Sequence, residues 1–262
     1  RSLRDASSGE RLVVLLVTIA IIALIVLPIA ALVNETFAII GARAALSDDG
    51  GASRIAAARA VGTSLVLALG AMVVALIVGG LGGIALARVR GSAVRLALAL
   101  PIAVPAVMLA VAYLATFNSS GYDLRGTPLL VLIAHSMLAY PFVVRPVAHA
   151  ARAIDPSLTE AAMILGASPR RAWWQIEFRL LSRALVVGAL FAFVVSLREV
   201  GATLLLHGAA FTTAPVAIAD ALTSGGTQPP EEAYVLATFL LGVTVVAFVI
   251  IERVRSRDAA EF

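Results

Sequence analysis

Long apolar segments constrain this chain more than any other feature. Crossing the hydrocarbon core of a bilayer as a helix takes about 20 apolar residues, and six stretches approach that length. They are Leu12–Val33, Val61–Ala87, Val94–Phe117, Leu129–Val147, Ala184–Leu205 and Tyr234–Ile251. Only 14% of the residues are charged, whereas about a quarter are charged in soluble domains. We therefore predict an all-α membrane bundle of six spans over residues 12–251, with polar end segments at 1–11 and 252–262.

The arginine distribution predicts how the bundle is oriented. With six spans, both chain ends and the second and fourth loops share one side, which carries Arg1, Arg4, Arg11, Arg88, Arg90, Arg95, Arg152, Arg170, Arg171, Arg179, Arg183, Arg253, Arg255 and Arg257. The opposite side carries only Arg43, Arg54, Arg59 and Arg125, beside Asp48, Asp49, Asp123, Glu231 and Glu232. Because arginine-rich loops stay in the cytoplasm, we predict that both termini are cytoplasmic. The net charge of +4 reflects these loops and gives no reason to expect nucleic-acid binding.

Glycine and proline positions indicate how the spans pack and bend. Gly79 and Gly83 form a small-xxx-small pair in the second span, a pattern that lets helix backbones approach closely in lipid. The third and fourth spans contain Pro101, Pro105, Pro141 and Pro146. Proline removes a backbone donor, so we expect kinks in both spans; for Pro141 and Pro146, a helix end is an equally good interpretation.

The predicted cytoplasmic loop at 150–183 carries local signals for two helices. Asp155-Pro156 supplies an N-cap residue with proline at the first helical position. The helix that starts there is expected to end at Gly166, since glycine accepts the positive φ of a helix C′ residue. Ser168-Pro169 repeats the start signal, and a second helix leads toward the fifth span. The loop is thus predicted to be a projecting helix-turn-helix that docks into a partner protein.

The same loop carries a family resemblance. Glu160-Ala161-Ala162, followed by Gly166 and then Ile176, resembles the EAA motif of the inner-membrane permeases of binding-protein-dependent type I ABC importers. Those permeases usually end the motif with a leucine and a proline, where this chain has Phe178 and Arg179. The resemblance implies a six-span permease of a bacterial inner membrane with a coupling helix in this loop. It assigns Glu160, Ala161, Ala162, Gly166 and Ile176 to the coupling with an ABC ATPase.

The resemblance also implies partners and a mechanism. Two six-span units would pair, identical or as halves of one fused polypeptide, and an extracytoplasmic solute-binding protein would deliver the cargo for ATP-driven alternating access. A G-x-x-x-x-G-K-S/T phosphate loop needs a lysine, and the chain has none. ATP and magnesium are therefore assigned to the partner ATPase, and this chain is predicted to be no enzyme and to bind no cofactor of its own. One motif copy and a polar start without methionine favour half of a fused permease over a standalone subunit.

Two ionisable residues lie in the predicted fifth span. Arg198 and Glu199 fall roughly 21 Å from its cytoplasmic end, and charges at such depth usually face a bundle interior or an aqueous cavity. They are candidates for the translocation path, with a structural ion pair as the alternative. The segments 196–203 and 213–218 resemble the corresponding region of thiamine, ferric-iron and molybdate or sulfate permeases, so thiamine or ferric iron is the favoured cargo.

Other function classes have weaker support. An ion-coupled secondary transporter would use Glu199 as its ion site and would be expected to show inverted repeats, which are not evident. A membrane-embedded enzyme would need catalytic side chains that converge at one depth, and no such set is evident. The histidines, His135, His149 and His207, are scattered and make a poor metal site. With no cysteine in the chain, thiolate metal sites and disulfides are excluded.

Overall fold

The structure, a computed structural model, describes residues 8–46, 51–89, 91–119, 123–224 and 230–259. Outside these ranges lie parts of both predicted end segments, residues 1–7 and 260–262. Three residues used to predict the orientation also lie outside them: Asp48, Asp49 and Arg90. The described part contains helices and no strand: α1 (Ser8–Leu46), α2 (Gly51–Arg88), α3 (Ser92–Ala103), α4 (Ala106–Ser119), α5 (Pro128–Ala139), α6 (Pro141–Ala153), α7 (Pro156–Ile164), α8 (Pro169–Ala172), the π-helical turn η2 (Trp173–Glu177), α9 (Phe178–Leu197), α10 (Gly201–Leu206), α11 (Ala214–Thr223) and α12 (Glu231–Ala259). The predicted all-α class is confirmed.

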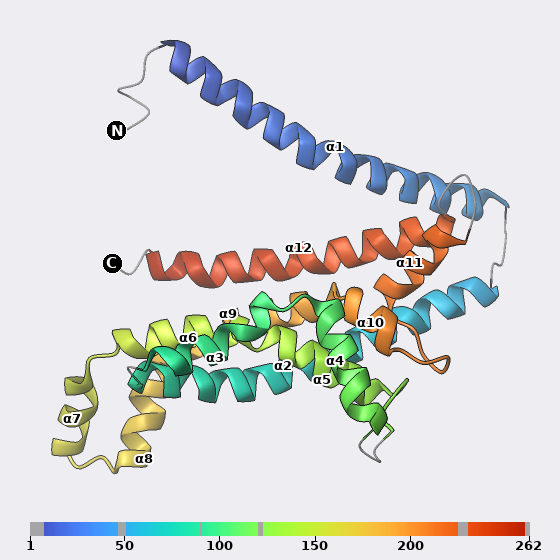
Figure 1. The fold of residues 1–262 in the computed structure, drawn as a ribbon. Helices are drawn as coiled ribbons and strands as arrows, with labels where there is room; N and C mark the ends of the chain where they lie inside the picture. Colours follow the sequence, from blue (N-terminus) through green and yellow to red (C-terminus); the bar gives the residue numbers. More distant parts are fainter. Residues whose placement is uncertain (1–7, 47–50, 90, 120–122, 225–229, 260–262) are drawn as a thin grey trace.

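Five helical stretches within these ranges are long and apolar enough to cross a membrane. They are α1, α2, the consecutive α5–α6, the continuous α8–η2–α9, and α12. Figure 1 shows that α1 begins and α12 ends on the same side of the bundle as α7 and α8. We call this side the α7 end, and the side with α10 and α11 the opposite end.

The third predicted span is not one helix. Val94–Phe117 is divided between α3 and α4, and Val104 between them has an extended backbone with φ −93° and ψ 121°. Val104 precedes Pro105, whose ring disfavours the α-helical region for the preceding residue. Pro101, by contrast, lies inside α3. The kink expected in this span is thus a break between two helices, and it lies at Pro105 and not at Pro101.

The fourth predicted span consists of α5 and α6, which are joined at Tyr140, directly before Pro141. Thr127 caps the start of α5, and α5 passes into α6 through Tyr140, whose backbone stays helical although Pro141 follows it. The Tyr140 carbonyl accepts hydrogen bonds from the N–H groups of Val143 (2.9 Å) and Val144 (3.0 Å). Pro146 lies within α6, so the helix-end interpretation fails for this residue.

The fifth predicted span has the wrong bounds at both ends. Ala184–Leu205 was expected, but the helical stretch begins at Pro169 and ends at Leu197. The second loop helix predicted from Ser168-Pro169 is present and runs into the span without a break. It was not counted as part of the span because Arg170, Arg171 and Arg179 lower the local hydropathy. Beyond Leu197 the chain turns and restarts as the short helix α10.

The core of the bundle forms where α6 packs between α2 and α9. Three glycines allow this approach: an added Cβ at Gly79 would lie 2.7 Å from the Tyr140 carbonyl oxygen, one at Gly83 would lie 2.8 Å from Val147 Cβ, and one at Gly188 of α9 would lie 2.9 Å from Val143 Cα. The predicted packing role of Gly79 and Gly83 is confirmed. A second apolar cluster joins α2, α4, α5 and α10 through Leu67, Ala110, Leu130, Val131, Ala134, Ala202 and Leu206.

Helix α1 lies at the periphery and diverges from the bundle toward the α7 end (Figure 1). Its large apolar side chains are mostly exposed, from Leu12 (56%) to Leu27 (67%), which suits a surface that faces lipid or another membrane helix. Its buried hydroxyl, Thr36 Oγ1, lies 2.7 Å from Thr238 Oγ1 and donates to the Tyr234 carbonyl (3.1 Å). These bonds fix α1 to α12 near the opposite end.

Candidate functional site

The α7 helix is formed by the local signals that predict it. The Asp155 side chain accepts a hydrogen bond from the Ser157 N–H (2.9 Å), which caps the helix and holds the pKa of the Asp155 carboxyl below its ordinary value. At the other end Gly166 has φ +92°. The Gly166 and Ala167 N–H groups donate to the Met163 and Ala162 carbonyls, both at 3.0 Å, which is the Schellman pattern. The predicted start and end of this helix are confirmed.

Helix α7 projects from the bundle and buries none of its residues (Figure 1). Glu160 and Ala161 are exposed and Ala162 is partly covered. Ile164 and Leu165, which sequence reasoning did not select, are 86% and 88% exposed at the tip. They lie outside the membrane-spanning stretches, so lipid does not account for their exposure. Exposed apolar residues beside polar ones are typical of a protein-docking surface.

The base of α7 is tied to the bundle by Glu177, which sequence reasoning also missed. Its Oε1 accepts a hydrogen bond from Thr159 Oγ1 of α7 (3.4 Å), and its Oε2 lies 3.7 Å from the Arg88 guanidinium at the end of α2. Glu177 belongs to the π-helical turn that connects α8 to α9. One carboxylate thus links α7, α2 and the start of the fifth span.

Ile176 lies in the same π-helical turn and is partly buried. Trp173, Trp174 and Phe178 form an aromatic cluster around this turn, with ring centroids 4.6–5.6 Å apart. Contacts at such distances stabilise the local backbone, and π-turns occur frequently at functional sites. The structure therefore places Ile176 at the root of the loop, away from the tip that carries Ile164 and Leu165.

Arg198 and Glu199 lie beyond the end of α9, which corrects their predicted position inside the fifth span. Glu199 turns toward α10, where its Oε1 accepts a hydrogen bond from the Ala202 N–H (2.8 Å). Arg198 is the exposed C-cap residue of α9 and lines a groove of about 600 Å³ against α11 and α12. Among the described residues neither forms an ion pair, so the expected pairing is not found there.

His135 holds the α9–α10 junction to α5. Its imidazole is 2% exposed, with Nδ1 2.8 Å from Ser196 Oγ and Nε2 2.8 Å from Thr203 Oγ1. Both ring nitrogens are therefore satisfied by hydroxyl groups, one on each side of the break between α9 and α10. His135 is therefore a core histidine. No group of three or more His, Asp or Glu side chains suited to a metal ion occurs in the ranges that the structure describes.

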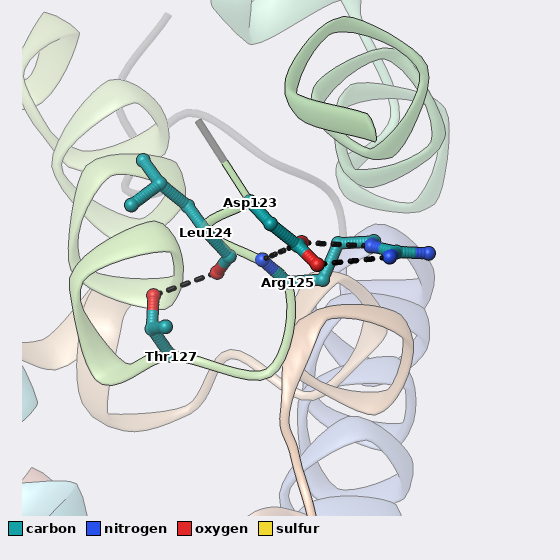
Figure 2. Close-up of polar contacts among 4 residues, drawn as sticks. All are labelled: Asp123, Leu124, Arg125 and Thr127. Atoms are coloured by element: carbon teal, nitrogen blue, oxygen red, sulfur yellow. Dashed lines mark hydrogen bonds and ion pairs between the residues drawn. The ribbon is translucent and has the colours of Figure 1, made fainter. Parts of the chain in front are cut away.

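The opposite end of the bundle carries a tight charged turn before α5 (Figure 2). Arg125 donates to both carboxylate oxygens of Asp123, from Nε at 2.8 Å and from Nη2 at 2.9 Å. These side-chain bonds, together with a bond from the Arg125 backbone N–H, lower the pKa of Asp123 to about 2. Gly126 follows with φ +67°, and its backbone packs against Gly208 from the α10–α11 connection.

Comparisons with known proteins identify related permeases. Residues 79–257 match the family model described as "Binding-protein-dependent transport system inner membrane component". The chain is 29% identical over 199 residues to the putrescine transport system permease protein PotI of Escherichia coli, an alignment covering 72% of this chain and 70% of that protein. It is 30% identical to the putative 2-aminoethylphosphonate transport system permease protein PhnV of Salmonella paratyphi A, covering 60% and 58% of the two chains.

A third relative is the molybdenum transport system permease protein ModB of Mycobacterium tuberculosis, with 32% identity over 136 residues that cover 47% of this chain and 52% of that protein. The family match extends from the glycine pair of α2 to the last turns of α12 and includes the whole α7–α8 loop. The chain belongs to the family of inner-membrane permease components of binding-protein-dependent ABC importers.

Proposed function

We propose that this chain is the permease subunit, or one half of a fused permease, of an ABC importer, and that α7 is its coupling helix. The observation that carries the proposal is the geometry of α7 within a family-matched bundle. The helix projects beyond the membrane stretches, buries none of its own residues and presents Ile164 and Leu165 at its tip. A groove on an ATPase subunit would cover these side chains, and the α7 end would then face the cytoplasm.

The proposed transmission of movement runs through the base of the loop. ATP binding and hydrolysis on the partner would displace α7, and Glu177 would pass the displacement to α2 through Arg88 and to α9 through the continuous helix. Rigid helices with discrete arrangements are the usual carriers of such coupling. A second six-span unit, identical or fused, would complete a path that opens alternately to the two sides of the membrane.

The proposed cargo is a small solute delivered by an extracytoplasmic binding protein. The relatives reported above are named for putrescine, 2-aminoethylphosphonate and molybdenum transport. The preference for thiamine or ferric iron rests only on the resemblance of segments 196–203 and 213–218. Arg198, which lines the groove beside α11 and α12, stays a path candidate. Glu199 is a weaker candidate for the path, because its carboxylate already accepts a hydrogen bond from the first turn of α10. The same bond weakens the alternative of an ion-coupled transporter that uses Glu199.

Co-purification from mild-detergent membranes tests the coupling assignment. Wild type, Gly166→Arg and Leu165→Glu are compared with Gly41→Arg, a control at the opposite end where an added Cβ meets nothing within 4 Å. An ABC ATPase should accompany wild type and the control and be lost from the two α7 variants. The assignment would be overturned if both α7 variants retained the ATPase. It would also be overturned if wild type retained a second permease unit but no ATPase.

A further inference from the structure

A basic pocket at the α7 end of the bundle lies outside the coupling loop. It has a volume of about 280 Å³ and lies between the end of α2, helix α3 and one face of α6. Its basic lining residues are Arg145, His149 and Arg152, and its apolar walls include Leu86, Leu98 and Val144. This volume is close to the lower end of the range for small-molecule sites, about 300–1,000 Å³.

The three basic residues lie on one face of α6. Arg145, His149 and Arg152 follow one another at intervals of four and three residues, the spacing that brings helical side chains together. All three are exposed. Arg145 lies seven residues before Arg152, roughly 10 Å deeper along the helix. Long arginine side chains can bend along an apolar wall toward a common point, so both guanidinium groups can converge on a ligand at the level of His149.

Structural needs of the chain account for only one of these residues. Arg152 donates from Nη2 to the Leu86 carbonyl (3.1 Å), which ties α6 to α2. Neither Arg145 nor His149 has a hydrogen-bond or ion-pair partner among the described residues, and no acidic residue belongs to the described lining. Charged side chains at membrane depth are costly unless a polar group meets them. The pocket therefore has donors and positive charge without a matching acceptor in the described chain.

We propose that this pocket binds a phosphate-type oxyanion through Arg145, His149 and Arg152. Arginine presents donors in a planar fork that fits phosphate oxygens, and basic pockets between helices at the cytoplasmic side of a membrane bind anionic headgroups. The apolar walls suit the glycerol and first acyl carbons of a phospholipid, and the open side admits a free oxyanion. The headgroup argument rests on the proposed cytoplasmic orientation of the α7 end, but binding requires neither ATP nor transport, so the site can be tested apart from the proposed permease function.

Two binding measurements on purified permease distinguish the sources of the anion. Native mass spectrometry compares how many phosphatidylglycerol and phosphatidylcholine molecules the permease retains. Equilibrium dialysis measures the binding of inorganic phosphate. Arg145→Gln is compared with Arg179→Gln, which removes an exposed arginine of α9 that does not line the pocket. Loss of one charged hydrogen-bonding partner should weaken binding at least about tenfold, while Arg179→Gln should bind as wild type does.

Preferential retention of phosphatidylglycerol that Arg145→Gln abolishes would identify a lipid headgroup site. Phosphate binding that the same variant weakens would identify a site for a free oxyanion. Binding of neither probe by the wild type, or equal binding by wild type and Arg145→Gln, would overturn the proposal. An Arg145→Gln/His149→Gln variant that elutes as wild type does in size-exclusion chromatography excludes misfolding as the cause of a loss.

Discussion

Replacing Gly79 and Gly83 by alanine adds one methyl group at each of two contacts between α2 and α6. At Gly79 the new Cβ would lie 2.7 Å from the Tyr140 carbonyl oxygen, and at Gly83 it would lie 2.8 Å from Val147 Cβ and 2.9 Å from the Val144 carbonyl oxygen. Backbone oxygens cannot rotate away as side-chain ends can. The helices must therefore separate to accept the methyl groups, and the core around α6 would loosen.

The expected magnitude follows from two opposing effects. Alanine is favoured over glycine inside a helix by about 1 kcal/mol, whereas an extra methyl group in a tightly packed core costs about 1–3 kcal/mol. Because each new methyl group would meet a backbone oxygen below 3 Å, the upper part of that cost applies, about 2–3 kcal/mol. After subtraction of the alanine preference, each substitution should lower the free energy of unfolding by about 1–2 kcal/mol, and the pair by about 2–4 kcal/mol. Gly62 and Gly242, which also lie in helices, have no atom within 4 Å of an added Cβ, so alanine there should stabilise by about 0.5–1 kcal/mol.

Thermal unfolding in detergent, followed by size-exclusion chromatography of heated samples, measures these differences. A change of 1 kcal/mol shifts the midpoint by about 2–4 °C for a chain of this size. The Gly79→Ala/Gly83→Ala variant should melt about 4–16 °C below wild type, and Gly62→Ala and Gly242→Ala at or slightly above it. A double variant that melts with the controls would refute the close approach of α2 and α6.

Three further predictions concern other parts of the bundle. Glu177→Ala removes the link to Arg88 and should raise hydrogen exchange in α7 about twofold to fivefold; exchange unchanged from wild type would contradict the anchoring role. His135→Ala leaves two buried hydroxyls poorly paired and should cost about 2–3 kcal/mol by thermal unfolding, whereas a loss below about 0.5 kcal/mol would contradict the bonds described. The Asp123 carboxyl should titrate near pH 2 by NMR, below its ordinary pKa of 3.8. Because this pKa is depressed, the bridge to Arg125 stabilises the turn above pH 3.8, and this stabilisation is lost as the pH falls through about 2. Titration of the carboxyl near pH 4 would contradict the bridge.

The α7 helix could be predicted from sequence because its determinants are local. Asp155 and Gly166 lie at its two ends, and each acts on backbone groups within a few residues. The breaks in the membrane helices could not be placed in this way. Pro101 and Pro105 have the same intrinsic preferences, yet only Pro105 follows a break, while Pro101 lies inside α3. Neighbouring helices decide which proline is tolerated, and the sequence alone does not supply them.

The membrane part of the candidate site was predicted less well. Arg198 and Glu199 were expected inside a span because the apolar run continues to Leu205. The chain turns after Leu197 instead, and the new helix is stabilised by the Glu199 cap. His135 meets partners 61 and 68 positions away. Contacts at such separations follow from the packing of α5 against α9 and α10 and leave no local pattern.

Cross-linking from the tip of α7 tests the central claim most directly. The chain has no cysteine, so Leu165→Cys introduces a unique thiol at a side chain that is 88% exposed. A short thiol-reactive photocross-linker attached there in native membranes should join the permease to an ATP-binding-cassette subunit, with a yield that changes when ATP is added. Leu222→Cys, 57% exposed in α11, should give no such product. Cross-linking of an ABC ATPase from Leu165→Cys alone would support the coupling role of α7. If the Leu165→Cys thiol reacts fully with the reagent but no ATPase is cross-linked, that role is contradicted. Equal cross-linking of the ATPase from Leu165→Cys and Leu222→Cys would contradict it as well.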